Sequence, residues 1–153
     1  MKTLAEPTVL AQLLDRLARL TPTTARRWGT LTAAEVLCHL GDAGESVLGL
    51  RIPPGSKASA KGNRLIKWIA LYSHMPWPTG VETRPGINPH KEGTRPGNFD
   101  QDRARVVEGL RSLAVAPAAA YPPVHFRFGP ITRSEWQRWA YLHVDHHLRQ
   151  FGL

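Results

Sequence analysis

Apolar residues recur every three to four positions along much of the chain, the spacing that places them on one face of an α-helix. The clearest stretch begins at Thr8 and ends at Leu20, just before Pro22. A shorter stretch, 63–74, mixes basic and apolar residues. The pattern predicts four principal helices and this short one, over residues 8–20, 32–50, 63–74, 100–113 and 132–151.

Glycine and proline mark the connections between these helices. Nine of the 26 glycines and prolines lie in residues 75–98, which we expect to be irregular, and the alanine- and proline-rich residues 114–121 read as a loop. No segment alternates apolar and polar residues as a strand does. The predicted fold class is all-α. We expect one domain over residues 1–153, a four-helix bundle with a long irregular crossover connection between the second and third core helices.

Two segments one hundred positions apart share a pattern. Residues 27–35 and 127–135 each end in Thr-x-x-Glu, beginning at Thr32 and at Thr132. This is the capping box, in which the threonine and glutamate side chains bind free amides at the start of a helix. The likeness comes from duplication or from convergence on a favourable cap. In either case it predicts where two helices begin.

Composition excludes several classes of protein. Hydrophobic residues make up 42% and charged residues 21%, as in ordinary globular proteins. The single cysteine, Cys38, rules out an internal disulfide and fits a reducing compartment, so we expect a cytoplasmic protein. No apolar run reaches the ~20 residues of a membrane helix, and the N-terminus lacks the apolar core of a signal peptide.

Two features of the composition are unusual: a formal net charge of +8, and seven histidines, three of them within five residues.

The last predicted helix has a clear core face. At ~100° per residue, five of its residues fall within about an 80° arc that must face the core: Trp136, Ala140, His143, His147 and Phe151. His146 lies on the flank of this face with Trp139 and Gln150, and Arg138, Asp145 and Arg149 face solvent.

Histidines at i and i+4, as at His143 and His147, can bind one metal ion or can be hydrogen-bonded core residues. A third ligand is available at His39, on the edge of the apolar face of helix 32–50. Facing helices of a bundle commonly build such sites. Three histidines with an open position suit the activation of water or a thiol.

Other polar residues near this site are open to more than one interpretation. Asp42, one turn after His39, orients that histidine, acts as a base or is an ordinary solvated helix residue. Cys38 is rotated by about 100° from His39 and is expected in the core. His125 is expected near the end of the bundle. The remaining two histidines, His74 and His90, are expected on the surface.

The positive charge raises the alternative of a polyanionic partner. No acidic residue lies between Glu45 and Glu82, an interval that contains Arg51, Lys57, Lys61, Arg64 and Lys67. These residues form a solvated face, contact nucleic acid or hold an acidic thiol cosubstrate. No nucleic-acid-binding motif accompanies them, so nucleic-acid binding is the least favoured of these hypotheses.

Two segments resemble the DinB/YfiT-like superfamily. One is Trp28-Gly29 followed by Thr-Ala-Ala-Glu-Val-Leu-Cys-His-Leu at 32–40, and the other is His-Val-Asp-His-His-Leu-Arg-Gln-Phe-Gly at 143–152. The chain is most similar to a bacterial DinB-like branch with a Phe-Gly-x-hydrophobic-[Ser/Thr]-x-x-Glu-Trp motif, here at 128–136, and the ending Asp-His-His-Leu-Arg-Gln-Phe-Gly. The resemblance covers nearly the whole chain. One departure is Phe126, where that branch has proline.

The resemblance implies a four-helix bundle that holds a divalent metal ion, usually zinc or nickel. Carried over by position, the ligands are His39, His143 and His147. Relatives include thiol transferases that use low-molecular-weight thiols and a thiol-dependent isomerase, and many are dimers. We therefore expect a small-molecule substrate, with a thiol as one candidate, a homodimer, and no nucleic-acid or membrane partner.

Three functions remain open at this point. The first is a metal-dependent enzyme, thiol transferase-like or hydrolase-like, with an open coordination position. The second is a non-catalytic metal-binding or structural helical bundle. The third, drawn from the charge alone, is a nucleic-acid-binding protein.

Overall fold

The computed structural model describes residues 1–51 and 62–153. It confirms the predicted helices, whose ends differ from the prediction by one to three residues. They are α1 (Pro7–Ala18), α2 (Ala33–Val47), α3 (Arg64–Tyr72), α4 (Phe99–Val115) and α5 (Arg133–Gln150). The connections contain two short 3-10 helices, η1 (Pro85–Ile87) and η2 (Ala118–Ala120).

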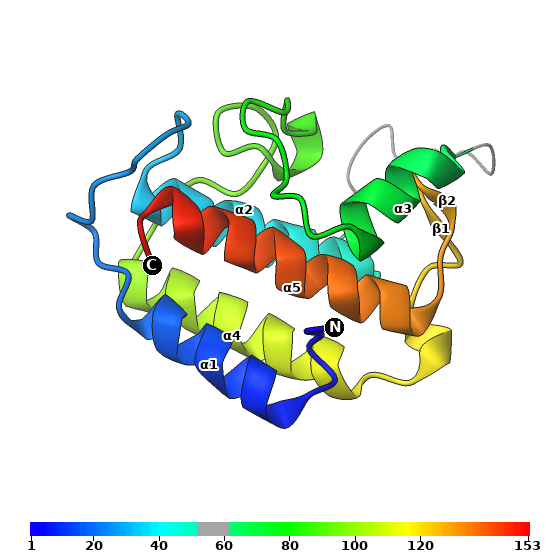
Figure 1. The fold of residues 1–153 in the computed structure, drawn as a ribbon. Helices are drawn as coiled ribbons and strands as arrows, with labels where there is room; N and C mark the ends of the chain where they lie inside the picture. The colour runs from blue at the N-terminus through cyan, green and yellow to red at the C-terminus, as the bar shows by residue number, and fades with distance from the viewer. Residues whose placement is uncertain (52–61) are drawn as a thin grey trace.

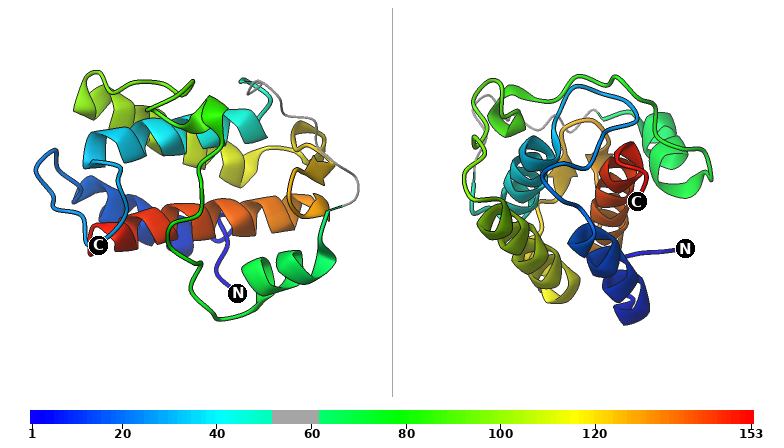
Figure 2. Two further views of the ribbon diagram at one scale, coloured as in Figure 1. Left: turned by 90° about the horizontal axis from the view of Figure 1, so that it is seen from above. Right: turned by 90° about the vertical axis from the view of Figure 1, so that its left-hand side faces the viewer.

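The four long helices form the predicted bundle, in which α1 and α2 each pack against both α4 and α5 (Figures 1 and 2). In Figure 1, α2 and α4 run in the same direction, and α1 and α5 run in the opposite one. Because α2 and α4 are parallel, the chain must return along the bundle between them. Residues 73–98 make this return across the outside of α2 and α5.

The core lies among the four helices and consists mainly of leucine. Eight leucines are at most 1% exposed: Leu4, Leu13, Leu17, Leu20, Leu37, Leu71, Leu113 and Leu148. Full burial of one such side chain contributes about 2 kcal/mol to stability. The apolar periodicity of the sequence therefore corresponds to the interior of the bundle.

Both predicted capping boxes are present. Thr32 accepts a hydrogen bond from the Glu35 amide, and the Glu35 carboxylate accepts one from the Thr32 amide at 2.8 Å. Thr132 and Glu135 make the same reciprocal pair at the start of α5. Each cap satisfies amides that the helix itself leaves free. The starts of α2 and α5 are thus set by the same local interaction.

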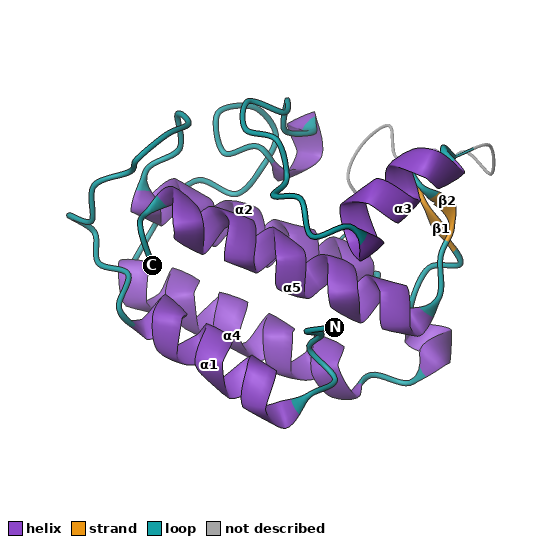
Figure 3. Cartoon of the chain, viewed as in Figure 1, coloured by secondary structure: helices purple, strands orange, loops and turns teal. Residues whose placement is uncertain are grey.

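The structure confirms the all-α class and adds one small hairpin that the sequence pattern did not indicate. Strand β1 (Val124–His125) pairs antiparallel with β2 (Gly129–Pro130) beside α3 (Figure 3). Strands of two residues are too short to produce an alternating pattern. Gly129 has a φ of 74°, in the left-handed region that glycine adopts without strain. No helix in the described residues is long and apolar enough to cross a membrane.

Candidate metal centre

Three histidines meet where α2 packs against α5. One ring nitrogen each of His39, His143 and His147 lies within 4.8 Å of the other two. The Nε2 atoms of His39 and His143 are 2.9 Å apart. Among the described residues, this is the group of histidine, cysteine or acidic side chains whose geometry can hold a metal ion.

The ring of His39 is held by the backbone of the crossover. Its Nδ1 lies 2.8 Å from the carbonyl oxygen of Ile87, at the end of η1. A carbonyl oxygen only accepts hydrogen bonds, so Nδ1 must carry the proton. In the neutral ring, Nε2 then carries the lone pair, and it accepts a hydrogen bond from Nε2 of His143.

The ring of His147 is held in the same way by a side chain. Its Nδ1 lies 3.0 Å from Oε1 of Gln150, one turn further along α5. The Nε2 of Gln150 donates to the carbonyl of Trp28 at 3.0 Å, which determines the orientation of the amide. Nδ1 of His147 is therefore the donor, and its Nε2 is free. Partners of this kind orient metal-binding histidines in proteins.

Charge and spacing both suit a divalent cation. Burial lowers the pKa of His39, and it lowers the pKa values of His143 and His147 to well below their usual range. The rings are therefore neutral near pH 7 and can offer lone pairs. Tetrahedral ligands at zinc–nitrogen distances lie about 3.3 Å apart, so the His39 and His143 nitrogens need to separate by only a few tenths of an ångström.

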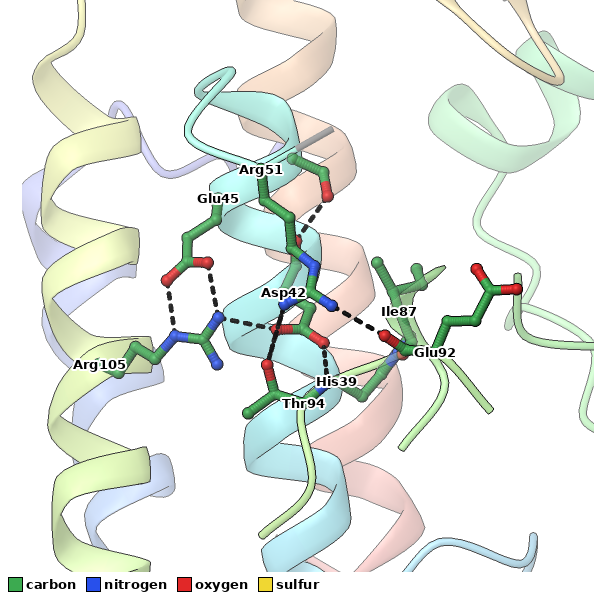
Figure 4. Close-up of polar contacts among 9 residues, drawn as sticks. His39, Asp42, Glu45, Arg51, Ile87, Glu92, Thr94 and Arg105 are labelled. Atoms are coloured by element: carbon green, nitrogen blue, oxygen red, sulfur yellow. Dashed lines mark hydrogen bonds and ion pairs between the residues drawn. The ribbon is translucent and has the colours of Figure 1, made fainter. Parts of the chain in front are cut away.

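Asp42 is completely buried, so its interpretation as a solvated helix residue is wrong. Its carboxylate accepts hydrogen bonds from the amide and hydroxyl of Thr94 at 2.7 and 2.6 Å, as Figure 4 shows. Arg51 and Arg105 also donate to it, at 3.0 and 2.7 Å. Within the described residues no hydrogen bond joins Asp42 to His39, whose Nδ1 is bound instead by the Ile87 carbonyl.

The contacts of Asp42 nevertheless reach the metal centre through the crossover. Thr94 lies in the same irregular segment as Ile87, and Arg51 also donates to the carbonyl of Glu92 at 3.0 Å. Arg105 joins this cluster to α4 and has a raised pKa because of its hydrogen bonds with Glu45. The cluster therefore attaches the crossover to α2, and the Ile87 carbonyl of the crossover orients His39.

The structure also shows whether the remaining cysteine and histidine side chains are buried or exposed. Cys38 is buried as expected, and burial raises the pKa of its thiol to about 12. His74 and His90 are exposed, as predicted. His146 lies outside the ligand group, with its ring 4.6 Å from that of Trp28. The hairpin residue His125 is buried.

Asp145 was expected to face solvent, and this is wrong. It forms an ion pair with Arg16 of α1 at 2.6 Å, and its side chain is only 18% exposed. The reason is that α1 packs against α5, so this side of α5 is covered.

The predicted basic interval is partly neutralised. Arg51 pairs with Asp42, and Lys67 pairs with Glu135 at 2.9 Å. Lys57 and Lys61 lie outside the described residues.

A cleft of about 1180 Å³ adjoins the three histidines, all of which line it. Its walls come from α2, α3, α5, the crossover and the hairpin, and they are mostly apolar. Trp77 and Trp139 lie beside His143, with ring centroids 6.2 and 4.8 Å away. One side of the histidine cluster is thus accessible to a small molecule.

A sequence model of one protein family matches most of this chain. The model of the DinB superfamily matches residues 5–151. The chain belongs to the DinB superfamily. Comparison with curated proteins gives no significant match. Comparison with solved structures gives none either. In this DinB-superfamily member, the three histidines and the cleft beside them are the features that indicate a function.

Proposed function

We propose that the protein is a metal-dependent enzyme that holds one divalent ion, zinc or nickel, on His39, His143 and His147. The carrying observation is the orientation of the rings. The Ile87 carbonyl and the Gln150 amide bind the Nδ1 atoms of His39 and His147, which leaves the Nε2 lone pairs of both rings without a partner outside the histidine cluster.

The open side of the cluster favours an enzyme over a structural metal site. Structural zinc sites use four protein ligands, whereas catalytic sites keep one position open. In the described part of the chain, the ligand group contains three side chains, and all three line the cleft. When bound, a divalent ion with an open position lowers the pKa of a thiol or water molecule placed there. The apolar walls would exclude bulk water from a bound small-molecule substrate.

The first test is metal analysis of the purified protein. We expect about one divalent ion per chain, lost in His143→Ala and His147→Ala and much weakened in His39→Ala. His74→Ala is the matched control, because His74 is exposed and outside the ligand group. Stoichiometric metal that survives both substitutions in α5 would contradict the proposed ligands.

The second test separates the reaction classes. Metal-loaded protein is assayed with cysteine and 1-chloro-2,4-dinitrobenzene for thiol transfer, and with 4-nitrophenyl acetate for hydrolysis. In one of the two assays, we expect the metal-loaded wild-type protein to be faster than His147→Ala treated with the same metal. If wild-type protein and His147→Ala have equal rates in both assays, the result would favour the alternative, a non-catalytic metal-binding or structural bundle.

Nucleic-acid binding has less support. A phosphate-binding surface needs available positive charge, whereas Arg51 and Lys67 are already bound to Asp42 and Glu135. A salt-dependent mobility shift with DNA or RNA would revive this alternative.

A further inference from the structure

The cleft has a second polar region, formed by Arg84 of the crossover and His125 of the hairpin. The Trp139 ring lies near both this region and the metal centre, with centroids 5.8 Å from His125 and 4.8 Å from His143. Neither Arg84 nor His125 belongs to the group of possible metal ligands. This region therefore needs its own explanation.

Arg84 provides a positive charge without a counter-charge in the described structure. Its guanidinium carbon lies 4.4 Å from the centroid of the Phe126 ring, which also lines the cleft. No described residue accepts a hydrogen bond or forms an ion pair with its side chain, and burial lowers its pKa. An arginine remains charged even so, and its planar N–H groups match the two oxygens of a carboxylate.

His125 provides a neutral donor with a fixed direction. Its Nδ1 accepts hydrogen bonds from the amides of Arg127 and Phe128 at 3.2 and 3.3 Å. Burial lowers its pKa to about 3, so the ring is neutral near pH 7. The single ring proton is therefore on Nε2, the nitrogen that the hairpin does not use. The ring is stacked on Phe128, with centroids 4.2 Å apart, and cannot turn freely.

We propose, resting on the function proposed above, that Arg84 and His125 bind a carboxylate group of the substrate. The apolar part of the substrate lies in the cleft against Trp139 and Phe126 and extends towards the three histidines. A planar guanidinium beside a neutral N–H donor matches the two oxygens of a carboxylate. Two further cations line the cleft nearby. Lys91 pairs with Glu82 at 3.0 Å, and Arg127 is an exposed residue whose guanidinium carbon lies 5.8 Å from the centroid of the Phe126 ring. A carboxylate with an aromatic or aliphatic body therefore fits both the charge and the lining of this cleft.

The test compares two probes of the same shape, 2-naphthoate and the neutral 2-naphthamide. Their dissociation constants are measured by calorimetry with chelator-treated and with metal-loaded protein, so that the result does not depend on the proposed metal chemistry. We expect wild-type protein to prefer the carboxylate by about tenfold or more in both forms, the usual strength of a charge-assisted hydrogen bond.

Arg84→Gln should abolish this preference and leave the affinity for the amide unchanged. Arg111→Gln is the matched control, because Arg111 is exposed on α4 and outside the cleft, and it should keep the preference. Equal affinities in wild-type protein, no binding of either probe, or a preference that survives Arg84→Gln would overturn the proposal. A preference that requires metal and survives Arg84→Gln would place the carboxylate at the metal instead.

The role of His125 has its own measurement, since its substitution also removes an acceptor from the hairpin. The nitrogen chemical shifts of the imidazole should identify Nε2 as the protonated atom in wild-type protein. The Nε2–H signal should move on addition of 2-naphthoate and stay in place with 2-naphthamide. A signal that naphthoate leaves unchanged would remove His125 from the carboxylate site.

Discussion

Two polar clusters lie within one turn of each other on α2, and they differ in what remains unbound. The Asp42 cluster is charged, and its carboxylate is fully occupied by Thr94, Arg51 and Arg105. The cluster around His39 is neutral and keeps lone pairs that point at a shared position. His39 is 3% exposed and Asp42 is fully buried, so burial alone does not separate them.

The two clusters differ in whether their acceptor atoms are already occupied by donors from other segments of the chain. A buried carboxylate surrounded by donors holds segments of chain together, whereas neighbouring rings with free lone pairs can accept a cation. Asp42 therefore contributes to the fold and to the placement of the crossover. The histidine cluster instead offers ring nitrogens that lie within 4.8 Å of one another to a cation.

The largest expected effect comes from removing the charged cluster. Asp42→Ala should lower the free energy of unfolding by about 3 kcal/mol, because two arginines and the Thr94 amide lose their acceptor. We expect this lower end of the usual range because both arginine side chains are about a quarter exposed. Urea denaturation of metal-free protein measures the change.

The matched control for Asp42→Ala is Glu108→Ala, since Glu108 is an exposed acid on α4. It should change the free energy of unfolding by less than about 0.5 kcal/mol. If the two variants are equally stable, the Asp42 cluster does not have the structural role assigned to it.

A smaller effect is expected from the partner of a metal ligand. Gln150→Leu removes the acceptor that orients His147 and should lower metal affinity by about 10- to 100-fold. Competition with a chromophoric chelator measures the affinity, and Gln12→Leu on the exposed side of α1 is the control. Unchanged affinity in Gln150→Leu would mean that the ring of His147 does not need this hydrogen bond.

The smallest effect per pH unit concerns His125, a buried neutral histidine outside the metal centre. The unfolded chain protonates His125 near pH 6.5, whereas the folded ring does so only near pH 3. Its contribution to stability is therefore fully present above about pH 6.5 and is lost as the pH falls towards 3. In metal-free protein, His125→Phe should reduce the dependence of unfolding free energy on pH by about 1.4 kcal/mol per pH unit below pH 6.

Urea denaturation at several pH values measures this slope, with His74→Gln as an exposed control that should behave as wild type. Identical slopes in wild type and His125→Phe would show that the buried ring is protonated in the folded protein.

The sequence was most informative where the interactions are local. Thr32 and Thr132 predicted the starts of α2 and α5 because a capping box involves residues only three apart. Helical spacing then placed His143 and His147 on the core face and His146 beside it. With the caps known, the position of each side chain around the helix follows from 3.6 residues per turn.

The sequence was least informative where a contact comes from the irregular crossover. The partner of His39 is a backbone carbonyl at Ile87, and any residue type has one. The ion pairs of Asp42 depend on how residues 73–98 return along the bundle, which periodicity does not describe. Gln150 was placed only on a flank, although its spacing of three from His147 on one helix was a usable signal.

The two capping boxes also bear on where the chain can change in length. His39 follows Thr32 by seven residues, and His143 follows Thr132 by eleven. Inserting one residue inside either interval would rotate the histidine by ~100° and shift it by about 1.5 Å along the helix. An insertion in residues 19–31 or 116–123 would leave both intervals intact. Insertions and deletions among homologues should therefore fall outside both cap-to-histidine intervals, which should keep a constant length.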